Sequence, residues 1–139
     1  MTKTLFLAFF LSYFYVTQSH AKVQPLSTPL SAQVSVTGQI NLDQFNQLLN
    51  DGFKSVIVNR LDQDFDHITT VQQLRQLAEQ KQISVMYQPL QSKHISQADI
   101  QEFAKYYNEL PKPILMVCRS GTRSSALFNQ AKSQGLLHE

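Results

Sequence analysis

The chain has a single cysteine, Cys118, and the six residues after it are of types that bind anions. They are Arg119, Ser120, Gly121, Thr122, Arg123 and Ser124. A cysteine thiolate is a nucleophile, and nearby cations or helix N-termini lower its pKa. Guanidinium groups hydrogen-bond the oxygens of tetrahedral anions. The stretch therefore predicts a nucleophile in an anion-binding loop, with Cys118 and Arg123 as catalytic residues and the other five as the loop.

The residues around this stretch predict a strand that leads into a helix. Ile114–Val117 is a continuous apolar run, and Ala126, Leu127 and Ala131 repeat with helical spacing. Ligands of parallel sheets bind at the carboxyl ends of strands, and the first N–H groups of a helix bind anions. Gly121 permits a left-handed turn between the two elements. We therefore expect backbone amides to surround the sulfur.

The rest of the chain alternates between strand and helix patterns. Strands are expected at 33–37, 55–58, 83–87 and 114–117, and helices at 41–51, from Thr70, from Ser96 and after Gly121. Thr70 with Gln73, and Ser96 with Asp99, are typical of capping boxes. The expected fold is a single α/β domain with a largely parallel central sheet flanked by helices.

The first 21 residues have the three parts of a secretory signal peptide. Met1–Lys3 carries a positive charge, Leu5–Val16 is almost wholly apolar, and Ser19 and Ala21 are small residues before a cleavage point. An uncleaved anchor is the alternative, but a membrane span needs roughly 20 apolar residues. We expect an exported protein, periplasmic if the source is a Gram-negative bacterium, with no stable membrane anchor after cleavage. Residues 22–32 then form an extended lead-in, and residues 33–139 form the catalytic domain.

Composition argues against several other functions. The net charge is only +2, whereas a nucleic-acid binder needs a basic surface. The four histidines have no spacing typical of metal ligands, and one cysteine cannot build a thiolate zinc site. We expect no nucleic-acid partner, no metal and no cofactor.

Five stretches of the sequence resemble known families. The Cys118–Ser124 loop looks like that of rhodanese sulfurtransferases and of cysteine-based phosphatases. Taken together, the five stretches span about residues 34 to 128 and resemble the phosphatase-like domain of beta-lactamase-hydrolase-like proteins. The other four stretches are Val36–Ile40, Gly52–Arg60 with Asp62, Tyr87–Pro89 and Pro111–Pro113. The resemblance implies a dual-specificity-phosphatase-like fold, in a family described both as phosphatase-like and as sulfurtransferases.

The loop departs from the phosphatase pattern. That pattern places the arginine six positions after the cysteine, but here Arg123 comes one position earlier and Ser124 takes its place. Val117 also replaces the usual histidine before the cysteine. The loop is therefore Cys-x4-Arg, as in many rhodaneses. A shorter ring of amides encloses less space, which favours a persulfide over a phosphate.

A phosphatase also needs a general acid to protonate its leaving group. The stretch in which the resembling enzymes carry an Asp, Gln88–Ser96, contains no Asp or Glu. His94 is one candidate, and an Asp of the 62, 64 and 66 triplet is another. Asn59 and Arg60 follow a strand end and are further candidates to line the pocket. Each has a plainer role open to it: a solvated loop for His94, an acidic turn for Asp62, and turn hydrogen bonds for Asn59 and Arg60.

Sulfur transfer places fewer demands on these residues. A Cys118 persulfide would take its sulfur from a small-molecule donor and pass it to a thiol acceptor, without a strong acid. The sequence therefore favours a sulfurtransferase. The alternatives are a protein-tyrosine or dual-specificity-phosphatase-like hydrolase that forms a phosphocysteine from a phosphoester, and an anion-binding module without turnover.

Overall fold

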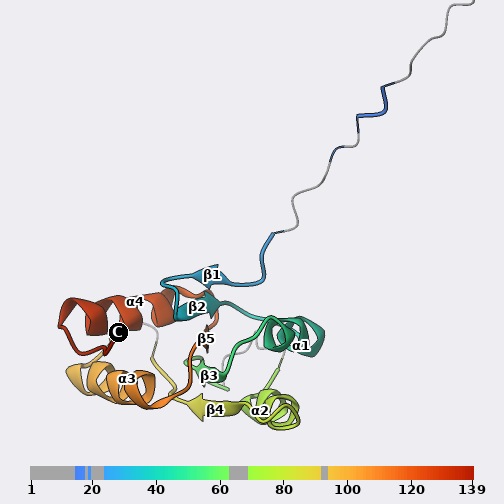
Figure 1. Ribbon diagram of the computed structural model, residues 1–139. Coiled ribbons are helices and arrows are strands. Elements are labelled where there is room, and N and C mark those ends of the chain that lie inside the picture. Colours follow the sequence, from blue (N-terminus) through green and yellow to red (C-terminus); the bar gives the residue numbers. More distant parts are fainter. Residues whose placement is uncertain (1–14, 18, 20–23, 63–68, 92–93) are drawn as a thin grey trace, which may run out of the picture.

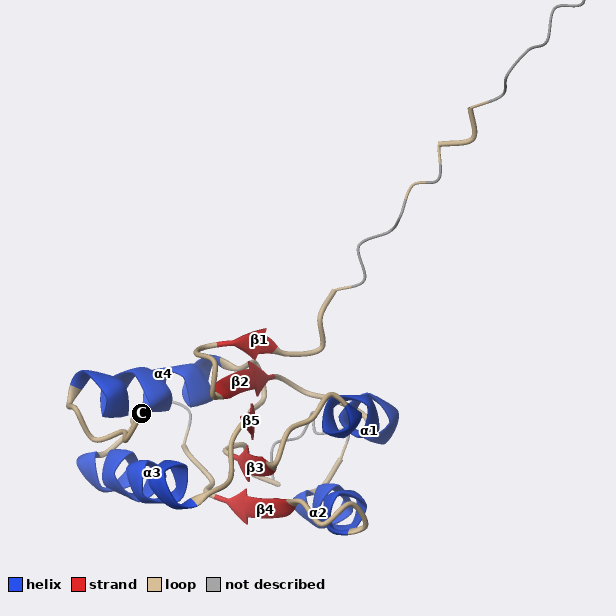
Figure 2. Ribbon diagram, in the orientation of Figure 1, coloured by secondary structure: helices blue, strands red, loops and turns tan. Residues whose placement is uncertain are grey.

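The domain has one five-stranded sheet between two layers of helices (Figures 1 and 2). The computed structural model describes residues 15–17, 19, 24–62, 69–91 and 94–139. The strands are β1 (Thr28–Pro29), β2 (Val34–Thr37), β3 (Ser55–Val58), β4 (Ser84–Tyr87) and β5 (Ile114–Val117). The helices are α1 (Leu42–Asn50), α2 (Val71–Glu79), α3 (Gln97–Glu109) and α4 (Thr122–Ser133). The strand order is β1-β2-β5-β3-β4, in which only the edge strand β1 is antiparallel to its neighbour.

The two faces of the sheet bury different side chains of the same strands. Val56 and Val58 pack with the apolar residues of α1 and α2, whereas Ile57, between them, packs with those of α3 and α4. Side chains alternate between faces along a strand, so a run of apolar residues gives both layers a core. This explains why β3 and β5 are fully buried.

Three of the four helices in the described part of the chain begin with a capping box. The side chain of the N-cap residue accepts a hydrogen bond from the amide of the residue three positions later. The side chain of that later residue accepts a hydrogen bond from the N-cap amide. The N-cap residues are Asn41, Thr70 and Ser96. Such boxes use up backbone donors of the first turn. Helix α4 differs, because its N-cap is Gly121, which has no side chain to bond these amides. Its first amides are therefore available to another acceptor.

The expected α/β architecture is confirmed, and the four parallel strands fall where the sequence places them. Within α1, Phe45, Leu48 and Leu49 are buried, whereas Leu42 at the first position is 37% exposed. The lead-in contributes β1, a strand too short for its sequence to indicate. The expected signal peptide lies outside the described residues apart from 15–17 and 19, and it stays a prediction. None of the described helices is long and apolar enough to span a membrane.

The strand register brings four distant chain segments to one edge of the sheet. Thr37 and Val58 both pair with Val117, and Val58 also pairs with Tyr87. The residues that follow these positions are Gly38, Asn59, Gln88 and Cys118, and they meet at the carboxyl edge. The Cys118 amide donates to the Thr37 carbonyl at 3.0 Å, so the cysteine is fixed by the last backbone hydrogen bond of β2.

Gly38 lies directly against the loop after Cys118. The Gln39 amide donates to the Arg119 carbonyl at 3.1 Å. A Cβ atom on Gly38 would lie 3.0 Å from that carbonyl oxygen and 3.4 Å from the Ser120 Cα. A side chain at position 38 would therefore push on the backbone of the loop.

Gly38→Ala tests this contact. We expect the substitution to lower the free energy of unfolding by about 1–2 kcal/mol, as overpacking of backbone against backbone does. Denaturant unfolding of the two proteins measures the difference. Equal unfolding midpoints would show that the loop yields freely at this point and is not held by β2.

Candidate active site

Cys118 lies at the carboxyl end of the central strand β5 and is completely buried. The backbone amides of Ser120, Arg123 and Ser124 are hydrogen-bonded to its sulfur. Two of these amides belong to the first turn of α4, which begins without a side-chain cap. Backbone amides are therefore present around the sulfur, as expected, and Cys118 itself has no exposed surface.

The surroundings of Cys118 favour the thiolate. Burial raises the pKa of the thiol, because a charged sulfur loses its hydration. The three amides lower the pKa, and so does the positive charge of Arg123. Together they outweigh burial, and the pKa lies below the ordinary value of a cysteine. A lowered thiol pKa is the property that a cysteine nucleophile requires.

Gly121 gives the loop its turn into α4. Its φ of 83° lies in the left-handed region, where a residue with a side chain is strained. Gly121 is buried, whereas Arg119, Ser120 and Thr122 are exposed. The hydroxyl of Ser120 donates to that of Thr122 at 3.1 Å. The predicted loop residues thus form one turn after Cys118, with the hydroxyls of Ser120 and Thr122 on its exposed side.

A network of buried hydrogen bonds connects the start of α4 to the residues that follow β3 and β4. The Ser124 hydroxyl donates to Asn59 Oδ1 at 2.8 Å, and Asn59 Nδ2 donates to the Gln88 carbonyl at 3.1 Å. Ser124 and Asn59 are both wholly buried. The Ser124 hydroxyl therefore bonds Asn59, and it is the Ser124 amide that bonds the sulfur. Asn59 supports the loop through Ser124.

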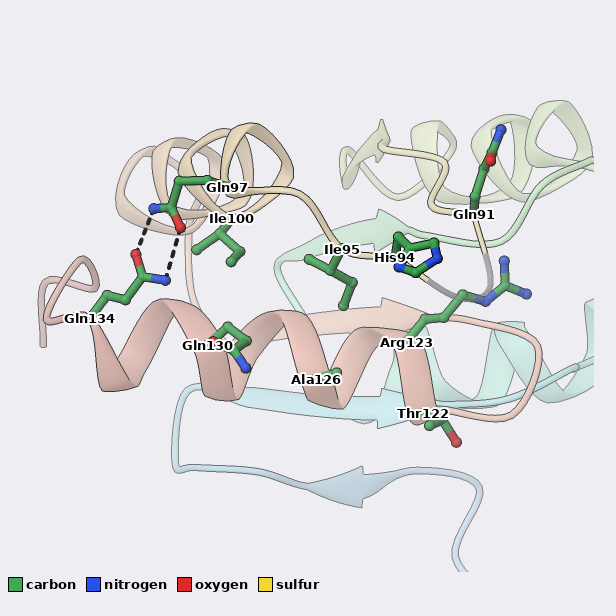
Figure 3. Close-up of a pocket in the computed structure, with 10 residues that line it drawn as sticks. All are labelled: Gln91, His94, Ile95, Gln97, Ile100, Thr122, Arg123, Ala126, Gln130 and Gln134. Atoms are coloured by element: carbon green, nitrogen blue, oxygen red, sulfur yellow. Dashed lines mark hydrogen bonds between the residues drawn. The ribbon is translucent and has the colours of Figure 1, made fainter.

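Arg123 lies at one end of a groove next to the loop (Figure 3). Its Nη1 donates to the Leu90 carbonyl at 2.7 Å, in the connection between β4 and α3. Figure 3 shows the groove, in which His94 lies near Arg123. The structure thus brings two of the predicted site residues, Arg123 and His94, into one pocket beside the cysteine.

Arg60 and Asp62 are engaged at the start of α2 instead. The Asp62 carboxylate accepts from the Val71 amide at 2.9 Å, which makes it a cap of α2. Arg60 is buried, and its guanidinium donates to the carbonyl and hydroxyl of Thr69. In this structure both side chains are bonded to residues at the start of α2, Asp62 to Val71 and Arg60 to Thr69. Positions 64 and 66 lie outside the described residues.

The sequence prediction missed several residues that hold the site. Gly38 and Gln39 carry the contact with the Arg119 carbonyl, and Gln88 and Leu90 offer carbonyls to Asn59 and Arg123. The sequence feature that could have identified them is their position just after a strand, because such residues meet at one edge of a parallel sheet. Across the part of the chain that the structure describes, no three His, Cys, Asp or Glu side chains gather into a metal site.

Solved structures of phosphatases have this architecture. A candidate phosphatase from Neisseria meningitidis matches with a TM-score of 0.71 at 25% identity, over 77% of this chain and 76% of that one. A candidate phosphatase from Shewanella putrefaciens matches with a TM-score of 0.68 at 21% identity, over 82% and 75%. The catalytic core of Siw14, a PP-IP phosphatase from S. cerevisiae, has a TM-score of 0.62 at 14% identity, over 78% and 65%.

The fold and the cysteine loop define a protein of the cysteine-phosphatase-like class. The model of one family, the phosphatase-like domain of beta-lactamase hydrolase-like proteins, matches residues 28–135. The chain belongs to this family, as its sequence resemblance implied. No curated protein matches the chain.

The lowered thiol pKa makes stability depend on pH. The unfolded chain has an ordinary thiol pKa of about 8.5, above that of the folded protein. Between the two values the folded state releases a proton that the unfolded state keeps, so Cys118 adds stability as pH rises. This contribution is complete above the unfolded pKa and is lost as pH falls through the folded pKa.

We therefore expect the stability advantage of the wild type over Cys118→Ser to increase with pH and then to level off. Urea unfolding of both proteins in a reducing buffer, from weakly acidic to weakly basic pH, measures this advantage. An advantage that is flat or decreasing with pH would contradict a thiolate in the folded state.

Asn59 and Ser124 are expected to set the thiol pKa through the amide of Ser124. Ser124→Ala leaves Asn59 Oδ1 buried without its donor, so we expect the protein to lose about 2 kcal/mol of stability. We also expect the thiol pKa to rise, measured as the ultraviolet absorbance of the thiolate against pH. Ser125→Ala is the matched control, because the Ser125 hydroxyl bonds the Gly121 carbonyl within its own helix. Equal pKa values of the Cys118 thiol in the two variants would show that Asn59 does not influence this pKa.

Proposed function

We propose that the protein is a cysteine-dependent phosphatase that hydrolyses phosphomonoesters through a phosphocysteine at Cys118. One observation carries the proposal: three amides and the charge of Arg123 favour a thiolate at the end of the central strand. The sequence alone favoured sulfur transfer. Its family and the phosphatase structures that share its fold support the phosphatase alternative instead.

The residues of the loop would act in the following order. The Cys118 thiolate attacks phosphorus, and a P–S bond forms as the ester P–O bond breaks. The leaving oxygen takes a proton, for which His94 is the candidate among the described residues of the groove. Water then attacks the phosphocysteine, which releases inorganic phosphate and restores the thiolate. Backbone amides of the same loop are the donors for the phosphate oxygens.

Aryl phosphate is the substrate that tests this function. Its leaving group is a weak base, so hydrolysis needs little help from a general acid. We expect slow turnover by the wild type, none by Cys118→Ser, and inhibition of the wild type by vanadate. Absence of turnover across weakly acidic and neutral pH would count against the phosphatase.

Sulfur transfer remains the second candidate because of two features of the loop. Arg123 comes one residue earlier than in phosphatases, and Cys118 is wholly buried. A ring of this size accommodates one added sulfur atom more easily than a phosphate. The thiolate would attack the outer sulfur of thiosulfate, forming an S–S bond as the donor S–S bond breaks and sulfite leaves. An acceptor thiolate would then remove the added sulfur.

Intact-mass measurement after exposure to thiosulfate distinguishes the two reactions. A gain of one sulfur mass that cyanide removes, with no aryl phosphate turnover, would replace the phosphatase by the sulfurtransferase. Unchanged mass together with aryl phosphate turnover would support the phosphatase.

A further inference from the structure

A groove of about 570 Å³ runs from Arg123 along α4, between that helix and the segment that leads into α3 (Figure 3). This volume is within the range of small-molecule sites. Ten described residues line it: Gln91, His94, Ile95, Gln97, Ile100, Thr122, Arg123, Ala126, Gln130 and Gln134. Arg123 joins the groove to the cysteine loop, because its amide bonds the Cys118 sulfur while its side chain lines the groove.

The lining is polar but almost uncharged. Four glutamines, a threonine and a histidine line the groove, and Arg123 is the one permanent charge among its described residues. Gln97 and Gln134 exchange two hydrogen bonds, of 2.6 and 3.1 Å, at the end away from Arg123. The carboxamide of Gln130, between the two ends, makes no hydrogen bond with the described residues. A carboxamide both donates and accepts, and so does a hydroxyl of a ligand.

These properties select among phosphomonoesters. A polyanion would meet one fixed positive charge, and an aryl group would find no Phe, Tyr or Trp among the described lining residues. A neutral body with many hydroxyls matches the carboxamides, and its C–H groups match the apolar surface of Ile95, Ile100 and Ala126. We propose that this groove binds the neutral, hydroxyl-rich body of a sugar phosphate whose single phosphate lies at the Cys118 loop. The inference rests on the proposed function only where it says that the bound sugar phosphate is hydrolysed. Binding of the sugar phosphate to the groove does not depend on that reaction.

Binding to the full-length chain with Cys118→Ser tests the groove without turnover. The probes are glucose 6-phosphate and inorganic phosphate, and calorimetry gives the two affinities. We expect the sugar phosphate to bind about ten-fold more tightly, the effect of one or two additional hydrogen bonds. Equal affinities would overturn the inference, and so would a phosphoserine peptide that binds more tightly than the sugar phosphate.

Gln130→Leu, added to the same protein, is expected to weaken sugar phosphate binding about five-fold and to leave inorganic phosphate binding unchanged. Gln101→Leu is the matched control, because Gln101 is an exposed glutamine of α3 that does not line the groove. Equal effects of the two substitutions would overturn the inference. If the sugar phosphate keeps its advantage but the wild type hydrolyses no phosphoester, the groove stands and the proposed reaction fails.

Discussion

The bonding of backbone amides to one sulfur is the interaction on which the site depends. A helix leaves its first amides without partners, and three helices of this protein satisfy them with capping boxes. Helix α4 begins at a glycine and satisfies them with the Cys118 sulfur instead. The same bonds fix the loop and favour the thiolate, so the stability of this loop and the reactivity of the cysteine have one cause.

The rest of the sheet keeps that arrangement in place. β5 is central, and the ends of β2 and β3 flank it on either side. From β2, Gly38 packs against the loop backbone, and from β3, Asn59 holds the Ser124 hydroxyl. Neither residue bonds the sulfur itself. Parallel register alone brings these distant segments together, since all three strands end at the same edge.

Much of this could be predicted from the sequence. Apolar runs such as Ile114–Val117 predicted the buried strands, and the spacing of Thr70 and Gln73 predicted a cap that the structure contains. The position of Cys118 before a helix predicted the amides around it. These features depend on residues close together in the chain, so local sequence carries them.

The partners of polar residues after strands could not be predicted in the same way. Asn59, Arg60 and Asp62 lie within four positions, yet Asn59 turns toward α4 while Arg60 and Asp62 turn toward α2. All three are polar residues at the same strand end, and each can hydrogen-bond many groups. Only the packing of α2 and α4 on opposite faces of the sheet decides which partner each one meets.

The early position of Arg123 has a structural consequence for the chemistry. Successive residues of a helix are rotated by about 100°, so moving an arginine by one position changes the side on which it lies. Ser124 takes the inward position and binds Asn59, while Arg123 faces the groove and bonds Leu90. Main-chain amides therefore surround the sulfur, and the arginine side chain connects the loop to Leu90, before α3. The hydrogen bond from Arg123 to the Leu90 carbonyl thus holds in place a charge that lowers the pKa of the Cys118 thiol.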